Sequence, residues 1–379
     1  MRTSRDGSAA PGTRSWLLAV LVIVTGCGPA EPAKQVDRRD AGWDAGHDAG
    51  VDAGTDAGVD AGVDAGPVVV RRTGRFFEHP DRPIRQALAD QPIESVERGF
   101  GGRSLGFRIT LADGTRAYFK PAQSFSGMSW QAEIAAFHLD RELGLGRTAP
   151  SIGRRVALDA LLEAAGDDPR VEELQPEDGH IDGALIWWVP DRLHALPLPD
   201  GFERWLRIDD ALPPITPYQR ANLYREQAAA LTEDTPPREV PEPPDPDRED
   251  RPSELSDLIV FDYLIHNGDR WSSNRSNLRI VGEGGPLMFL DNAAGFTMRR
   301  PRTPLMDARL TGVQRFRRAT IAAIRRLSLR RFERRLDRDP RAPLLDPEQL
   351  EHFAARREAL LEHVDGLIAQ FGEDEVLCL

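Results

Sequence analysis

The sequence Asn267-Gly268-Asp269-Arg270-Trp271-Ser272-Ser273-Asn274 decides the fold when it is combined with the strand that follows it. Apolar residues 287–290 predict this strand, and Asp291 comes directly after it. An aspartate, an asparagine five residues later and a second aspartate behind a nearby strand have the spacing of phosphoryl-transfer sites. In such sites the first aspartate accepts a hydroxyl proton, while the asparagine and the second aspartate hold a divalent metal ion. On its own this pattern is usually a solvated turn, so residues earlier in the chain have to support it.

Lysine is almost absent from the chain, and this makes Lys120 informative. Of the 49 basic residues only Lys34 and Lys120 are lysines, so 47 are arginines (49 − 2), and Lys34 lies in a polar tail. Lysine carries a compact charge and arginine a planar fork, so arginine does not replace lysine where a small ammonium group must fit between phosphate oxygens. We therefore predict that Lys120 binds nucleotide phosphate. The alternative is a surface lysine that survived by chance.

A β-hairpin is predicted around Lys120. Apolar and polar residues alternate over 105–111, which is the period of a half-buried strand. Asp113-Gly114 marks a tight turn, and residues 116–120 form the return strand. The glycine-rich stretch 99–104 precedes this hairpin, and its backbone could bend over phosphate groups.

A helix with an acidic first turn should follow the hairpin. Residues 130–143 carry apolar side chains at helical spacing, and Gly144 is a stop signal. Glu133 lies in the first turn, where it would complement the helix dipole. Strand, lysine and then a helix with a glutamate is also the order in which kinases orient the phosphate-binding lysine by an ion pair. Both explanations of Glu133 stay open at this point.

Three further segments are predicted from composition and periodicity. Residues 182–191 form a short apolar run bounded by glycine and proline, which predicts a buried strand that either offers its backbone to adenine or is plain core. Residues 232–254 are mostly prolines and acids and predict an exposed loop. A helix should follow over 255–266 and end at the left-handed pair Asn267-Gly268, and helices should dominate from Thr311 onward.

The arginines near the C-terminus leave two interpretations. Twelve arginines and three acidic residues lie between positions 309 and 341, which is either a basic face for acidic substrates or the solvated surface of helices in an arginine-rich protein. The sequence has no zinc-ligand spacing, no Ser-His-Asp pattern and no aromatic-basic motif for nucleic acid. We therefore expect no nucleic-acid partner.

The N-terminus has the form of an export signal. Three arginines precede a short apolar run over 16–24, and small residues lead to Cys27. The run is too short to span a bilayer. Val24-Thr25-Gly26-Cys27 resembles the bacterial lipobox, in which the cysteine is acylated and becomes the first residue of the mature protein. Gly28 in place of an aspartate implies, by resemblance to lipoprotein sorting rules, the outer membrane or the cell surface.

A four-residue repeat follows the signal. Asp-Ala-Gly occurs seven times between Asp40 and Gly66, and its aspartates carry seven of the 12 net negative charges. No repeat holds enough apolar surface to offset the entropy of ordering, so the repeats predict a disordered tether. The only other cysteine is Cys378, so a lipidated Cys27 leaves no pair for an internal disulfide.

The folded region resembles a known family in several motifs. Residues 132–141, Ala-Glu-Ile-Ala-Ala-Phe-His-Leu-Asp-Arg, are similar almost letter for letter to a helix of the secretory-pathway kinase family that includes the Golgi casein kinase, the glycosaminoglycan xylosylkinase and four-jointed. The resemblance covers roughly residues 97–296. The other motifs occur in the family's order, namely Phe119-Lys120-Pro121, Gly183–Asp191, Phe261–Leu264, Asn267–Arg270 and Leu290–Asn292.

This resemblance implies an α+β, two-lobed atypical protein-kinase-like fold. It implies a small β-rich N-lobe over 71–181 and a larger helical C-lobe over 182–379, after a signal peptide over 1–27 and a tether over 28–70. ATP with Mn²⁺ or Mg²⁺ would be the cofactors, and the family works outside the cytosol. We expect a bacterial cell-envelope protein that is anchored by lipid.

The resemblance also assigns roles to single residues. Lys120 would bind phosphate and Glu133 would orient it. Asp269 would be the catalytic base, and Asp291 would bind metal. The remaining expected contacts to the nucleotide are Ser104, the backbone hinge of Ile186, Trp187, Trp188 and Val189, and Asn274 as a second metal ligand.

Three positions depart from the casein-kinase members of the family. Met128 stands where those members carry a metal-binding glutamate, Trp271 stands where they have histidine, and Asn274 stands where they have glutamate. Asn274 restores the ligand of ordinary protein kinases, so it could compensate for Met128. The family's disulfides are also missing.

The expected function is an exported, lipid-anchored kinase that transfers the γ-phosphate of ATP to a serine or threonine hydroxyl of a protein. A kinase for sugar hydroxyls is the first alternative, because the same family contains both. An inactive pseudokinase that serves as a binding module is the second alternative, and Met128 is the residue that favours it.

Overall fold

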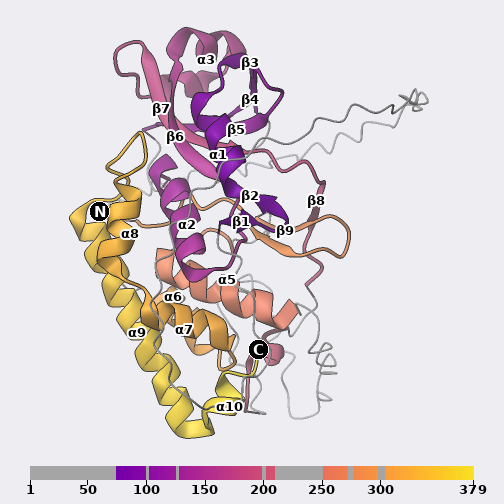
Figure 1. Cartoon of the computed structure of the whole chain (residues 1–379), viewed down its shortest axis with the longest axis vertical. Coiled ribbons are helices and arrows are strands. Elements are labelled where there is room, and N and C mark those ends of the chain that lie inside the picture. The colour runs from indigo at the N-terminus through magenta and orange to yellow at the C-terminus, as the bar shows by residue number, and fades with distance from the viewer. Residues whose placement is uncertain are drawn as a thin grey trace, which may run out of the picture. The chain divides into compact units, whose positions relative to one another are not determined.

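The computed structural model describes residues 74–99, 102–124, 128–198, 202–209, 251–271, 277–297 and 304–379 (Figure 1). The chain divides into two units, Met1–Asp64 and Ala65–Leu379, and all described residues belong to the second. Cys27, the repeat segment and Asn274 lie outside the described residues.

A five-stranded antiparallel sheet forms the N-terminal part, in the order β3-β4-β5-β7-β6. The predicted hairpin is present as β4 and β5, and Gly114 has the positive φ of 80° that its tight turn requires. The side chains of β4 alternate between buried and half-buried, as the sequence period indicated. The strands are β3 Ile93–Arg98, β4 Phe107–Leu111, β5 Arg116–Pro121, β6 Ser151–Ala157 and β7 His180–Trp187.

Helix α2, Trp130–Leu143, crosses between this sheet and the C-terminal helices. Its bounds are those predicted, and it ends at Gly144 in the left-handed conformation with φ 73°. Every side chain from Ala132 to Leu143 is buried, because α2 packs on β6 and β7 and also on the C-terminal helices α7 and α8. The smaller elements of this part are β1 Arg75–Phe76, β2 His79–Pro80, α1 Asp81–Asp90, α3 Leu158–Ala165 and the 3₁₀ turn η1 Pro169–Glu173.

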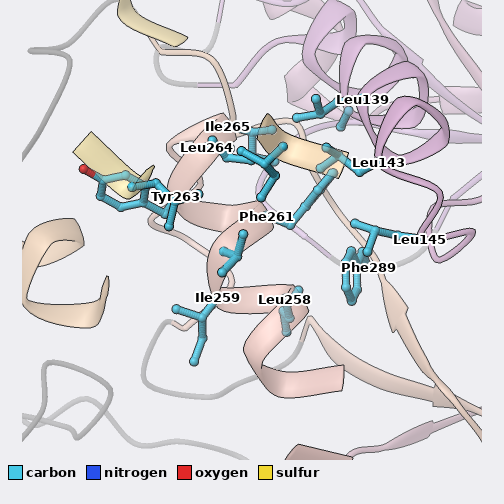
Figure 2. Packing of buried hydrophobic residues seen from close by; sticks show 14 of the residues in the cluster. Leu139, Leu143, Leu145, Leu258, Ile259, Phe261, Tyr263, Leu264, Ile265 and Phe289 are labelled. Carbon is cyan, nitrogen blue, oxygen red and sulfur yellow. The ribbon is translucent and has the colours of Figure 1, made fainter. Parts of the chain in front are cut away.

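The C-terminal part is mostly helical and is organised around α5, Arg251–Ile265. Every side chain from Pro252 to Ile265 is buried, so α5 lies inside the core of this part. Figure 2 shows its side chains meeting Leu139 and Leu143 of α2 and Phe289 of β10. The other described elements are β8 Leu193–Ala195, η2 Phe202–Leu206, β9 Leu278–Val281, β10 Leu287–Phe289, α6 Pro304–Thr311, α7 Arg318–Arg326, α8 Leu329–Leu336, α9 Pro347–Phe371 and α10 Glu373–Val376.

Three boundaries differ from the sequence prediction. Helix α5 already includes Arg251, four residues before the predicted Leu255 and inside the predicted exposed loop, and Glu254 of this turn is held inside by Arg147 at 2.7 Å and by the backbone N–H of Leu287. The left-handed residue after α5 is His266, with φ 60°, and not the pair Asn267-Gly268. Strand β7 pairs with β5 and β6, so the predicted lobe boundary between residues 181 and 182 falls inside a strand of the N-terminal sheet.

Among the described helices, none is both long enough and apolar enough to cross a membrane.

The close approach of β5 and β7 gives a test of this sheet. A Cβ at Gly183 would lie 2.4 Å from the Lys120 carbonyl oxygen, so Gly183→Ala should destabilise the fold by about 1–3 kcal/mol through overpacking. Gly366 in α9 is the matched control, because a Cβ there meets nothing within 4 Å. Gly366→Ala should stabilise the protein by about 0.5–1 kcal/mol through helix propensity. Urea unfolding of both variants measures the two shifts, and equal midpoints would contradict the strand register.

Candidate active site

Lys120 lies between two carboxylates that come from different parts of the fold. Its Nζ is 2.5 Å from Glu133 Oε1 on α2 and 2.5 Å from Asp291 Oδ1, which follows β10. The Lys120 side chain is 18% exposed and that of Glu133 is 4% exposed. The structure thus brings together three residues that the sequence separates by up to 171 positions.

The two carboxylates keep Lys120 charged. Burial alone would lower the pKa of Lys120, but the charges of Asp291 and Glu133 outweigh burial and raise this pKa above its ordinary value. Burial likewise opposes the charge of Asp291, yet Lys120 holds the pKa of Asp291 below its ordinary value. The cluster therefore carries one positive and two negative charges, with a net charge of −1 when Glu133 is ionised.

Glu133 also fixes the segment that carries Asp291. Its Oε1 accepts a hydrogen bond of 3.0 Å from the backbone N–H of Asn292, in addition to the bond from Lys120. The Asn292 side chain donates to the Phe289 carbonyl oxygen at 3.1 Å, which keeps the turn after β10 closed. The ion-pair explanation of Glu133 is the one that the geometry supports.

Asp291 has an uncommon backbone conformation, with φ 63°. A non-glycine residue in this left-handed region is strained and persists only where its surroundings hold it. The Asn267 side chain supplies part of that support, because its Nδ2 donates to the Asp291 carbonyl oxygen at 3.1 Å. Such outliers cluster at functional sites, so the strain at Asp291 supports its assignment.

Arg270 joins the segment around Asp269 to the turn after β10. Its side chain is fully buried, and its Nε donates to both carboxylate oxygens of Asp262 at 2.9 and 3.0 Å. The same guanidinium donates to the Leu290 carbonyl oxygen and, at 2.6 Å, to Asn292 Oδ1. A guanidinium has the donors that three fixed acceptors require, whereas the ammonium of lysine lacks this planar fork.

Trp271 completes this buried network. Its Nε1 donates to Asp262 Oδ2 at 3.0 Å, and its ring stacks on Phe202 with centroids 6.1 Å apart. Trp271 therefore packs against Phe202 and Asp262 directly after Arg270.

Asp269 is half-buried, and its environment disfavours the ionised form. Burial raises the pKa of Asp269, and the nearby charge of Asp291 raises it further, against weaker opposing effects of Arg270 and Lys120. A carboxylate whose pKa is raised binds a proton more tightly, so in its ionised form it is a stronger proton acceptor than a solvated aspartate.

The carboxylate of Asp291 has the chemistry that a divalent metal ion requires. Mg²⁺ and Mn²⁺ prefer carboxylate oxygens, and a cation would relieve the repulsion that raises the pKa of Asp269. Within the described ranges no three histidine, cysteine, aspartate or glutamate side chains converge as a closed metal cage. An open site that keeps several water and phosphate ligands agrees with the habit of Mg²⁺.

A cavity of about 190 Å³ opens beside Lys120 and Ser104. Its other lining residues are neutral, and most were not singled out from the sequence: Pro121, Ala122, Gln123, Met128, Ser129, Trp130, Gln131, Gln175 and Ala293. Asp269, Asp291 and the hinge residues do not line it. Met128, the position that departs from the expected family pattern, thus lines the cavity.

Gln123 and Arg170 hold the glycine-rich segment above this cavity. Gln123 brackets Leu105 through two hydrogen bonds of 2.8 Å, one to its N–H and one to its carbonyl oxygen. Arg170 of η1 donates to the carbonyl oxygens of Gly102 and Ser104, both at 3.3 Å. Both residues lie far from the segment in the sequence, so no local pattern pointed to them.

Two backbone N–H groups of the predicted hinge segment 186–189 are already engaged in hydrogen bonds within the fold. The N–H of Trp187 donates to the Pro150 carbonyl oxygen and that of Trp188 donates to the Arg116 carbonyl oxygen, both at 2.9 Å. The Val189 side chain is buried. The N–H groups of Trp187 and Trp188 are therefore already used and cannot serve an adenine contact.

Comparison with known proteins finds one matching family and solved structures with the same fold. A family model described as the C-terminal part of the Golgi casein kinase, Fam20, matches residues 176–376, which is 201 of 379 residues (376 − 176 + 1). This match covers just over half of the chain.

Several characterised proteins are similar in sequence. The glycosaminoglycan xylosylkinase of Homo sapiens is 25% identical over 334 residues, covering 78% of this chain and 76% of that protein. The same enzyme of Danio rerio is 28% identical over 250 residues, covering 56% of each. The extracellular serine/threonine protein kinase FAM20C of Homo sapiens is 27% identical over 235 residues, covering 55% of this chain and 40% of that protein. The chain therefore spans from less than half to about three quarters of the length of these relatives.

Two solved structures share the fold. The structure of hydra Fam20 with sugar superposes with a TM-score of 0.57 at 22% identity, covering 81% of this chain and 95% of that chain. The Golgi casein kinase with Mn/ADP bound superposes with a TM-score of 0.55 at 19% identity, covering 78% of each chain. The predicted α+β fold, with a β-sheet N-terminal region and a helical C-terminal part, is confirmed.

The buried guanidinium network gives a test of the site. Arg270→Lys keeps the charge but leaves acceptors on Asp262, Leu290 and Asn292 without donors, which should cost about 3 kcal/mol of folding free energy. Arg326→Lys on the exposed surface of α7 is the control, and it should change the stability by no more than about 0.5 kcal/mol. Denaturant unfolding of both variants separates a structural guanidinium from a surface charge, and equal stabilities would refute the network.

Proposed function

Because the chain belongs to the Fam20 family, we propose that it is a kinase that transfers the γ-phosphate of ATP to a hydroxyl group. The observation that carries this proposal is the placement of Lys120 at 2.5 Å from both Glu133 and Asp291, beside an open cavity. Kinases need a lysine oriented by a glutamate next to a metal-binding aspartate. The three side chains have this relation.

Each residue of the site has a distinct role in the proposal. Lys120 binds phosphate oxygens, and Glu133 keeps its ammonium oriented and charged. Asp269 accepts the proton of the acceptor hydroxyl. Asp291 would hold Mn²⁺ or Mg²⁺, with Asn274 as the second protein ligand, and the metal ion would neutralise phosphate charge. Ser104 and the backbone of residues 186–189 complete the nucleotide contacts.

Two classes of acceptor fit the proposal. A serine or threonine hydroxyl of a protein is the acceptor we expected from the sequence. A sugar hydroxyl is supported by two observations, the similarity to a xylosylkinase over 78% of this chain and the amide and indole side chains that line the cavity beside Lys120. Amide side chains and the indole of Trp130 are groups that hydrogen-bond and stack on a sugar ring. An inactive binding module remains the outcome if no acceptor is phosphorylated.

The direct test measures phosphate transfer from labelled ATP to a panel of secreted proteins and xylose-containing glycans across a manganese titration. The parent should label one class, and Asp269→Asn should lose at least about 100-fold in rate because no base accepts the proton. Asp291→Ala should abolish metal-dependent nucleotide binding. If Asp291→Ala binds and turns over ATP like the parent at every metal concentration, the kinase assignment is wrong.

The pH dependence of the rate tests the role of Asp269. Its base function requires the deprotonated form, and its pKa is raised above the ordinary 3.8, so the rate should fall with acidification at a higher pH than a solvated aspartate would give. Raising the metal concentration should move this fall to lower pH, because a cation offsets the charge of Asp291. A profile that is insensitive to metal, or unchanged in Asp269→Asn, would assign the titration to another group.

We also propose that the protein is exported and held at the bacterial cell envelope through an acylated Cys27, with residues 28–70 as the tether. The lipobox-like sequence before Cys27 supports this location. Mass spectrometry of the mature protein should find an acylated Cys27 at its N-terminus, and Cys27→Ser should release the protein from membranes. An unmodified Cys27 or a retained signal segment would disprove the anchor.

A further inference from the structure

Glu142 is a buried acid at an unfavourable end of a helix. It lies in the last turn of α2, and its side chain is 2% exposed. A helix C-terminus carries partial negative charge, so an acid there is destabilising unless cations offset it. Burial of an unpaired carboxylate would add a larger penalty. A compensating partner is therefore required at this end of α2.

Two arginines of α8 supply this compensation. Arg331 donates to Glu142 Oε2 through Nε at 3.0 Å and through Nη2 at 2.6 Å. Arg335 places its Nε 2.8 Å from Glu142 Oε1. The two arginines are four residues apart, so they project from one face of α8. A single buried carboxylate of α2 is thus held by two side chains of a C-terminal helix.

Helix α8 is itself firmly placed. Phe332 and Leu336 are buried in the large C-terminal core, and the Ser328 side chain caps the helix by accepting from the N–H of Arg331. Figure 1 shows α8 beside α2, in agreement with the contacts between their residues. The arginines therefore extend from a fixed support rather than from a loop.

The same helix carries Glu133 at its other end. Glu133 and Glu142 are nine residues apart (142 − 133), which is about 13.5 Å along a helix axis. Residues 132–143 are all buried, so α2 is expected to move as one body. A displacement at Glu142 would change the position of Glu133 relative to Lys120 and Asn292.

Among the described residues, Glu142 is the side chain at this end of α2 that pairs directly with a C-terminal helix. Arg141 pairs with Asp81 of α1 at 2.7 Å, and Asp140 accepts from the N–H of Arg147 at 2.9 Å. The Arg147 side chain in turn reaches Glu254 of α5 at 2.7 Å, so this second contact joins α2 to the C-terminal part only through a residue outside both helices. Asp291 follows β10 in the C-terminal part, so the distance between Lys120 and Asp291 depends on how α2 is held against that part.

We propose that Arg331 and Arg335 are positioning residues, which set the place of Glu133, and through it of Lys120, by holding Glu142. Their importance for turnover rests on the proposed kinase function, whereas their effect on Lys120 does not. The role is distinct from the catalytic one, since neither arginine lines the cavity beside Lys120.

Lys120 is a reporter of this effect that needs no enzyme activity. It is one of only two lysines in the chain, so its modification is read at a single peptide, and Lys34 in the N-terminal segment serves as an internal reference. Reductive methylation in the absence of nucleotide reacts with the unprotonated amine. Loss of the hydrogen bond to Glu133 frees the Lys120 amine and should increase its methylation rate roughly tenfold, the factor that one charge-assisted hydrogen bond is worth.

The experiment compares Arg331→Ala/Arg335→Ala with Arg330→Ala/Arg334→Ala on the full chain, well below the unfolding temperature. Arg330 and Arg334 are exposed on the same helix, and the described residues give them no ion pair. The first variant should methylate Lys120 about tenfold faster than the parent, and the second should match the parent. Arg331→Lys/Arg335→Lys should restore most of the protection, because the charge opposite Glu142 is kept.

Glu142→Gln provides a nearly isosteric second route if the double alanine variant does not fold. Equal Lys120 methylation in the parent, in Arg331→Ala/Arg335→Ala and in Glu142→Gln would overturn the proposal, as would an equal effect of the control pair. In kinetic assays kcat should fall about tenfold in the same variants that expose Lys120. A parent without kinase activity but with the predicted methylation pattern would refute the proposed function and leave the positioning role in place.

Discussion

The carboxylate of Glu133 accepts one hydrogen bond from Lys120 on the sheet and one from the backbone of Asn292 after β10. The rest of the site depends on this double acceptance, because it ties the N-terminal sheet to the segment that carries Asp291. A buried carboxylate is expensive unless every lone pair facing the interior has a donor. Glu133 meets this condition only while both partners stay in place, so the two parts of the fold constrain each other through one side chain.

The charges around Lys120 explain why such a site would take up a metal and a phosphate. Lys120 offsets one of its two acidic neighbours, and Asp269 has its pKa raised by burial and, to a smaller extent, by the charge of Asp291. Excess negative charge at a half-buried site attracts a divalent cation. The bound cation would then neutralise the charge of phosphate oxygens, so that they can bind beside the carboxylates. The backbone of Asp291 is strained and the guanidinium of Arg270 is buried, and both are unfavourable on their own. The contacts of the surrounding core hold them in place.

Local patterns predicted the parts of the fold that local forces determine. Helix α2 was predicted with its observed bounds, because Gly144 adopts the left-handed cap that ends it, and the hairpin followed from alternation around Asp113-Gly114. The pairing of β7 with β5 and β6 was missed because sheet order is set by tertiary contacts. For the same reason the early start of α5 was missed, since it depends on the distant Arg147.

The residues of the candidate site also fall into those that the sequence could indicate and those that it could not. Lys120, Glu133 and Asp291 could be predicted because each occupies a recognisable place on a strand, in a first helical turn or after a strand. Gln123 and Arg170 could not, because they act through backbone groups far away in the sequence. The hinge was predicted as a segment, but which of its N–H groups are free depends on Pro150 and Arg116 in neighbouring segments.

The central claim is that Lys120 lies at the phosphates of a bound nucleotide. An ATP acyl-phosphate probe, which transfers its acyl group to a lysine next to the bound phosphates, tests this directly in a chain with only two lysines. The account predicts that Lys120 is acylated in the presence of Mn²⁺, that excess ATP prevents the labelling, and that Lys34 stays unlabelled. Labelling of Lys34 alone, or labelling of Lys120 that ATP does not reduce, would contradict it.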